Sequence, residues 1–218
     1  MNLQKKTPPG RKCSALQPGL LALLIVGLSV CRAFAQESSP PVSVRIDTDE
    51  GAFTVELYAE KAPVTVANFL RYADSGAYNG GCFMRTVRPE NEMNRVKIQV
   101  IQAVVHPWKE NNSLPPIPLE RTSSTGVKHL DGTISMARGE PNSATSSFFI
   151  CIGDQPELDF GGKRNPDGQG FAAFGRVTSG MDVVRKIHMA RAEGQAIVPL
   201  VRIRSITRLS AKPAAAPR

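Results

Sequence analysis

Apolar and polar residues alternate along short runs of this chain, and turn-forming residues separate the runs. Residues 42–46 and 52–58 show this alternation, and the segment between them, DTDEG at 47–51, is rich in Asp and Gly. A period of two places successive side chains on opposite faces of a strand. The pattern therefore predicts a β-hairpin over residues 42–58.

Two segments have helical spacing instead. Within residues 62–75 the apolar positions recur every three or four residues, at Val66, Phe69, Leu70 and Ala73. Pro63 stands in the first turn and Gly76 just past the end, which is the usual punctuation of a helix. Residues 181–189 form the second predicted helix.

The remaining apolar runs predict further strands: residues 81–87, 96–105, 133–137, 147–152, 171–177 and 197–209. Many short strands with two helices are typical of a closed or nearly closed β-barrel capped by helices. A length of 218 residues allows one domain with tails. We place a linker at 36–41 (QESSPP), the domain at 42–209 and a disordered Pro/Ala tail at 210–218.

Residues 132–175 hold the most informative part of the pattern. Two apolar runs, TISMA and FFICI, flank a polar stretch, and a Gly- and Asp-rich loop then leads to FAAFG. Paired strands here would gather apolar side chains beside flexible polar loops. This predicts a shallow pocket for an apolar group, lined by Met136, Phe148, Phe149 and Phe171. The stretch contains no metal-ligand cluster, phosphate loop, or nucleophile next to a base.

The formal net charge of +8 belongs largely to the first 35 residues. They hold five of the 27 Lys and Arg residues and none of the 19 acidic ones, so the rest of the chain carries about +3. That charge is small and evenly spread, which argues against nucleic acid as a partner.

The same segment has the pattern of a signal peptide. A basic stretch precedes an apolar run at 20–30, and Ala33-Phe34-Ala35 offers a cleavage site before Gln36. The alternatives are an uncut anchor and, at Cys31, a lipoprotein site. The apolar run is about half of the ~20 residues that span a bilayer, and Val30 suits a lipoprotein site poorly. We expect an exported protein, periplasmic or secreted, with no stable membrane insertion after cleavage.

Cys82 and Cys151 remain after the leader is removed, and export would permit a disulfide. Alternation along strands opposes one. It directs Cys82 away from the face of Arg85 and places Cys151 on the face of Phe149. If Arg85 and Phe149 line one site, the thiols point apart, and we predict two free, buried cysteines.

A set of segments in fixed order carries a family resemblance: EGAFTVELY (50–58), KAPVTVANF (61–69), GCFMRTV (81–87), VIQA (100–103), GTISMAR (132–138), NSATSSFFI (142–150), LDFGG (158–162) and FAAFGRV (171–177). Together they resemble the cyclophilins, a family of peptidyl-prolyl cis-trans isomerases, over nearly all of residues 42–209. The resemblance implies a mostly β fold: a closed eight-stranded antiparallel barrel capped by two α-helices.

The implied reaction is rotation about the X-Pro peptide bond, whose barrier is ~18–20 kcal/mol. The twisted amide loses resonance, so its nitrogen accepts a hydrogen bond better than in the planar state. A fixed donor aimed at that nitrogen therefore binds the transition state preferentially. The resemblance assigns this donor to Arg85 and the orientation of the substrate to Gln102.

The resemblance also assigns residues to the proline pocket and to the peptide backbone. The substrate-binding residues that it implies are Phe83, Met136, Ala137, Arg138, Phe149, Leu158 and Phe171. Phe83 is expected in the core or at the pocket floor. Phe171 stands where the family has His or Tyr.

Some positions depart from the family pattern. Sixteen residues, 86–101, lie between Arg85 and Gln102, which is more than the family usually has there. The inserted part, about RPENEMNRVK, is polar and charged. Gln99 and Val100 stand where Phe and Met are usual, so the pocket is expected to be thinner, or rebuilt by Met93 or Ile98. Ser147 replaces a Gln. Glu157 replaces an aromatic residue that contributes to cyclosporin binding, which makes tight inhibition by that drug doubtful.

The sequence predicts no metal site and no cofactor. Its three histidines are scattered, without a carboxylate or cysteine at ligand spacing. The expected partners are proline-containing polypeptides, and the protein is expected to be a monomer. Two function classes stay open: an isomerase for exported proteins, or a peptide-binding, chaperone-like module with weak or lost catalysis.

Overall fold

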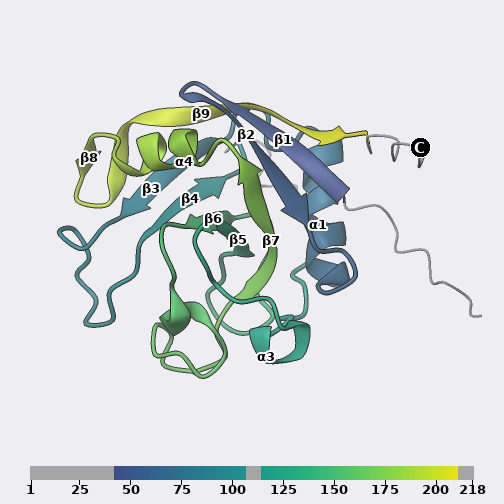
Figure 1. Ribbon diagram of the computed structural model, residues 1–218, viewed down its shortest axis with the longest axis vertical. Helices are drawn as coiled ribbons and strands as arrows, with labels where there is room; N and C mark the ends of the chain where they lie inside the picture. The colour runs from purple at the N-terminus through teal and green to yellow at the C-terminus, as the bar shows by residue number, and fades with distance from the viewer. Residues whose placement is uncertain (1–41, 107–113, 211–218) are drawn as a thin grey trace, which may run out of the picture. The chain divides into compact units, whose positions relative to one another are not determined.

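The computed structural model describes residues 42–106 and 114–210, and its framework is one antiparallel sheet (Figure 1). The strands are β1 (Val42–Thr48), β2 (Gly51–Leu57), β3 (Cys82–Val87), β4 (Val100–Val104), β5 (Thr133–Met136), β6 (Phe148–Cys151), β7 (Ala172–Ser179), β8 (Ala192–Glu193) and β9 (Ala196–Leu209). The helices are α1 (Pro63–Asp74), α3 (Thr122–Thr125), α4 (Met181–His188) and the 3₁₀ helix η1 (Pro156–Leu158).

The sheet closes into a barrel because β1 pairs with strands on both sides. The order β1-β2-β7-β5-β6-β4-β3-β9 returns to β1 through the β1–β9 pairing. Short β8 only extends β9 as a hairpin. The prediction of a closed eight-stranded antiparallel barrel is confirmed.

Both predicted helices are present, and their apolar faces join the barrel core. Pro63 opens α1, and the carboxylate of Glu120 accepts hydrogen bonds from the backbone N–H groups of Val64 (3.1 Å) and Thr65 (2.7 Å) at its first turn. These bonds satisfy donors that a helix leaves unpaired at its N-terminus. The α1 helix packs against β9 and β7, and α4 packs against β2, β3 and β4.

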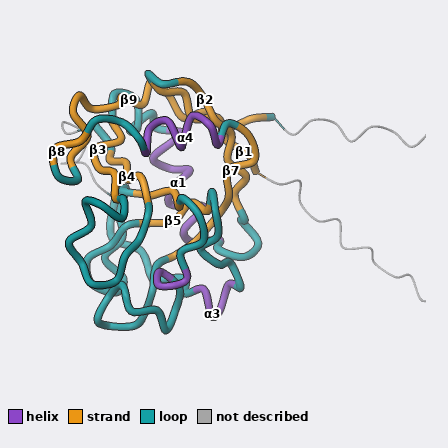
Figure 2. Tube along the Cα trace, turned by 60° about the vertical axis from the view of Figure 1, so that its left-hand side comes forward, coloured by secondary structure: helices purple, strands orange, loops and turns teal. Residues whose placement is uncertain are grey.

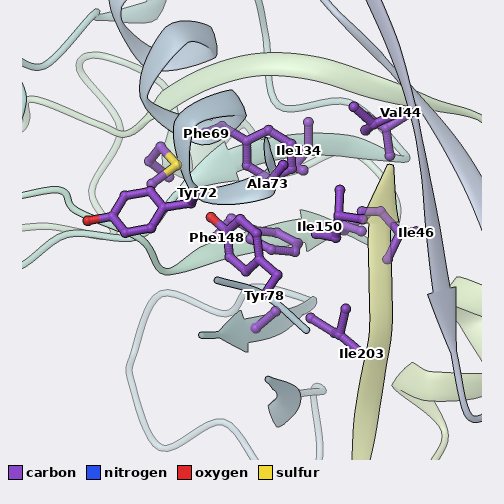
Figure 3. Packing of buried hydrophobic residues seen from close by; sticks show 14 of the residues in the cluster. Val44, Ile46, Phe69, Tyr72, Ala73, Tyr78, Ile134, Phe148, Ile150 and Ile203 are labelled. Atoms are coloured by element: carbon purple, nitrogen blue, oxygen red, sulfur yellow. The ribbon is translucent and has the colours of Figure 1, made fainter. Parts of the chain in front are cut away.

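Inward-facing residues of the strands fill the main core. Figure 3 shows side chains from α1 lying against side chains from the strands, among them Phe69 facing Phe148 and Ile134. Phe69 and Phe148 meet edge to face with ring centroids 5.5 Å apart. Figure 2 shows loops gathered around α3, on the side away from β9 and α4.

Several predicted segments lie outside the described residues. These are the leader at 1–35, the linker at 36–41, and the tail at 210–218 except for its first residue. Among the described residues, no helix is both long enough and apolar enough to cross a membrane.

Candidate active site

A β-bulge in β3 sets the position of Arg85. The pairing of β3 shifts register between Phe83 and Arg85 on both of its edges, against β4 and against β9. In a regular strand these two residues would share a face. Phe83 is instead 0% exposed in the main core, while Arg85 lines a surface pocket. The bulge thus turns Arg85 outward, which is a common use of bulges near functional sites.

Gln102 lies opposite Arg85 in the β3–β4 ladder and is oriented by two hydrogen bonds. Its Oε1 accepts from Arg85 Nη1 at 3.1 Å, and its Nε2 donates to Ser147 Oγ at 3.1 Å. The Ser147 hydroxyl in turn donates to the carbonyl of Ala103 at 3.0 Å. Ser147, which replaces the family's Gln, therefore still supports Gln102.

Gln195, in the β8–β9 turn, holds the other edge of the guanidinium. Its Oε1 accepts from Arg85 Nε at 2.9 Å and from Nη2 at 2.6 Å. Burial lowers the pKa of Arg85, and the neighbouring charge of Arg164 lowers it further. An arginine side chain nevertheless remains a cation in proteins. Gln195 carries no signal in the sequence that would mark it as part of the site.

The apolar part of the pocket is a second cluster, separate from the main core. Phe149 and Phe171 meet edge to face at 5.4 Å, and Leu158 of η1 lies with them. Ile98 and Val100 complete this cluster at the pocket. The pocket has a volume of about 200 Å³. Of the two residues predicted to rebuild the wall, the structure places Ile98 there, whereas Met93 is 94% exposed.

Arg138 braces the rim of the pocket. Its side chain is 1% exposed, its guanidinium binds both carboxylate oxygens of Asp167 (2.8 and 3.0 Å), and it lies 5.2 Å from the centre of the Phe171 ring. The hydrogen bonds from Arg138 lower the pKa of Asp167. Nε of Arg138 also donates to the carbonyl of Gly170 at 2.8 Å. Arg138 thus fixes the 161–170 loop beside the pocket.

Seven of the nine predicted site residues line this one pocket: Arg85, Gln102, Ala137, Arg138, Phe149, Leu158 and Phe171. The structure does not bring the other two to it. Phe83 and Met136 face the interior of the barrel and belong to the main core, with 0% and 1% exposure. For Phe83 the structure gives the first of its two expected places, the core, and its assignment to substrate binding is corrected. Met136 and Phe148, both expected in the pocket, lie in the main core as well, and their placement is corrected.

A buried polar group lies behind Phe149. The His129 ring stacks on the Phe149 ring at 6.0 Å, and its Nδ1 and Nε2 lie 2.8 Å from Asp159 Oδ1 and 3.0 Å from Ser135 Oγ. Burial lowers the pKa of His129 despite the adjacent carboxylate. These three residue types also form hydrolase triads, but Ser135 is fully buried and out of reach of a substrate. The group therefore serves to support Phe149.

The two cysteines are free and buried, as predicted. Cys151 lies in the same cluster as Phe149. Our argument assumed regular alternation between Cys82 and Arg85, and the register shift in β3 interrupts that alternation. The predicted result, two free and buried thiols, is nevertheless what the structure shows. Within residues 42–106 and 114–210, no group of three or more His, Cys, Asp or Glu side chains could hold a metal ion.

Comparison with known proteins agrees with this geometry. Residues 43–208 match the family described as cyclophilin type peptidyl-prolyl cis-trans isomerase. The chain belongs to the cyclophilin family. The bulge in β3, Gln102 opposite Arg85, and the apolar pocket thus belong to one cyclophilin domain.

Curated relatives and solved structures extend the match over most of this cyclophilin. Peptidyl-prolyl cis-trans isomerase A of Dickeya dadantii is 36% identical over 180 residues, which cover 80% of this chain and 86% of the relative. Peptidyl-prolyl cis-trans isomerase B of Escherichia coli is 35% identical over 145 residues, covering 66% and 82%.

A crystal structure of a cyclophilin type isomerase from Cryptosporidium parvum has a TM-score of 0.63 at 21% identity, covering 78% of this chain and 98% of that one. The same protein in the presence of the dipeptide Ala-Pro also gives a TM-score of 0.63. At this level of identity the likeness supports the fold.

Proposed function

We propose that this cyclophilin catalyses cis-trans isomerisation of X-Pro bonds, with Arg85 as the hydrogen-bond donor to the twisted prolyl amide. The observation that carries the proposal is the guanidinium of Arg85, fixed between two glutamine side chains at the edge of an apolar pocket. Unaided rotation takes tens to hundreds of seconds, so a donor that favours the twisted state has a large effect on the rate.

Arg85 keeps donors available for a substrate. A guanidinium has five N–H groups, and three of them bind Gln102 and Gln195. Counting partners among the described residues only, one N–H on Nη1 and one on Nη2 are left. Both glutamines are neutral, so they orient the guanidinium without cancelling the charge that strengthens its hydrogen bonds.

The apolar cluster provides the complementary half of the site. Phe149, Leu158 and Phe171 offer a non-polar surface on which a proline ring can rest while the preceding residue rotates. No covalent step and no proton transfer are needed, and no cofactor takes part in this proposal. The substrates are proline-containing polypeptides, and the leader pattern at residues 1–35 supports a role with exported proteins in the periplasm or outside the cell.

A protease-coupled assay on a proline tetrapeptide tests the proposal. Arg85→Ala should lower kcat/KM by roughly 100-fold or more, since removing one fixed donor from a charge-stabilising site costs about 2.7–4 kcal/mol. Arg71→Ala, on the exposed face of α1, is the matched control and should behave as the parent. Parental activity in Arg85→Ala would refute the mechanism. Peptide binding without isomerisation by the parent would favour the peptide-binding alternative.

A further inference from the structure

The long connection between β3 and β4, residues 88–99, contributes Ile98 to the pocket wall, but the rest of it has no role in the mechanism described so far. It was the main departure of this sequence from its family, and it lies against the β8–β9 hairpin. Asn91 makes the contact: its Nδ2 donates to the carbonyls of Thr86 (3.1 Å) and Gly194 (2.9 Å), and its Oδ1 accepts from the Arg88 backbone N–H (2.7 Å). One side chain therefore joins the end of β3, the connection and the hairpin turn.

Gln195 lies next to this junction and is held at both ends. The backbone N–H of Thr86 donates to the Gln195 carbonyl at 2.9 Å, which ties its main chain to the strand that carries Arg85. The side-chain Nε2 donates to the carbonyl of Asn91 at 3.0 Å. That bond fixes the amide with its oxygen towards Arg85, where it accepts from both Nε and Nη2.

We propose that Gln195 is a positioning residue for Arg85 and that the β3–β4 connection, through Asn91, holds Gln195 in place. This inference rests on the proposed function of Arg85. The plane of a guanidinium turns readily about the Cγ–Cδ and Cδ–Nε single bonds unless its edges are bound. Gln102 binds Nη1 alone, so without Gln195 the plane could swing about that single contact and misdirect its remaining N–H groups.

The orientation of the Arg85 guanidinium should have a measurable effect on the rate of isomerisation. Misplacing a catalytic group by about 1 Å can cost as much as ~100-fold in rate. The loss should fall mainly on kcat, because the apolar pocket that binds the proline ring contains no part of Gln195. It should also depend on Arg85, because Gln195 does not itself border the pocket.

A double-mutant cycle in the full-length protein tests this. Gln195→Leu removes the acceptor at similar size and should lower kcat ~10- to 100-fold with KM little changed. In the Arg85→Ala background the same substitution should have no further effect, which an independent structural defect would not reproduce. Gln195→Glu keeps the acceptor and should recover part of the rate. Glu193→Gln, exposed on the same hairpin and paired with Arg191, is the matched control with parental kinetics.

The Nε–H signal of Arg85 in NMR spectra provides a readout that does not depend on catalysis. In the parent this proton should exchange slowly with water, and in Gln195→Leu it should exchange at least about tenfold faster. Three results would each overturn the role of Gln195. Gln195→Leu could keep the parental kcat, it could lower kcat by the same factor in the Arg85→Ala background, or it could leave the exchange rate of the Nε proton unchanged. If Arg85→Ala is fully active, the proposed mechanism fails instead, and the exchange rate alone decides whether Gln195 orients the guanidinium.

Discussion

We expect truncation of Phe149 to alanine to lower both stability and kcat/KM, because Phe149 lies on the face of β6 that borders the pocket. The Phe149 ring is 5% exposed, and it lies between the His129 ring at 6.0 Å and the Phe171 ring at 5.4 Å. Removing a buried Phe side chain costs about 3–5 kcal/mol of stability. We expect a value near 3 kcal/mol, because the vacated space opens onto the pocket and water can fill it.

The same substitution removes one wall of the surface on which we propose that the proline ring rests. Fully burying an apolar side chain is worth about 1.5–3 kcal/mol. Losing part of that contact, about 1–2 kcal/mol, should lower kcat/KM roughly 5- to 30-fold. Urea denaturation measures the stability, and the protease-coupled assay, run where the variant is fully folded, measures the activity.

Phe148, the adjacent residue, is the matched control. Its ring is 0% exposed and meets Phe69, Tyr78 and Phe83 inside the barrel. Phe148→Leu should lower stability by roughly 1–3 kcal/mol and leave kcat/KM of the folded protein near that of the parent. If Phe149→Ala keeps parental kcat/KM, or Phe148→Leu loses as much activity, the assignment of the two faces is wrong.

Two further predictions concern buried ionisable side chains. Burial lowers the pKa of both His129 and His188. The unfolded chain therefore takes up protons near pH 6.5, whereas the folded protein does so only at lower pH. The free energy of unfolding, measured in urea, should fall as the pH drops from about 7 to below ~6.5, and a flat profile from pH 7.5 to 5.5 would contradict this. Glu92 and Arg164 form an ion pair at 2.9 Å with side chains 3% and 12% exposed. Glu92→Gln leaves the Arg164 charge buried without its partner and should lower stability by about 3 kcal/mol, whereas the double change Glu92→Leu and Arg164→Met should recover most of it. An unaltered urea midpoint in Glu92→Gln would show that the unpaired charge costs nothing.

The barrel could be predicted from the sequence because its signals are local. Alternating apolar residues mark the strands, and Pro63 and Gly76 mark the ends of α1, so each element carries its own evidence. One boundary differs clearly. We predicted a strand from residue 96, but β4 begins at Val100. The Val96 carbonyl instead accepts a hydrogen bond from Arg164 at 2.8 Å, so this segment turns towards the 161–170 loop.

The position of individual side chains was less predictable where the backbone departs from regularity. A single register shift in β3 separates Phe83, which faces the core, from Arg85, which faces the pocket. No pattern of apolar residues reveals such a shift, because it depends on how two neighbouring strands pair. The contact between Arg85 and Gln195 joins residues 110 positions apart in the sequence, and the hairpin that carries Gln195 has no motif of its own.

The two clusters of buried residues explain how this member can depart from its family without losing the fold. Along β6, Phe148 and Ile150 face the barrel core, while Phe149 and Cys151 face the site. The unusual residues Val100 and Ser147 border the site and lie outside the main core. The chain compensates for them locally: Ile98 closes the pocket wall, Ser147 supports Gln102, and the β3–β4 connection reaches Gln195. The added connection thus lies where it can reinforce the orientation of Arg85, on which the mechanism we propose depends.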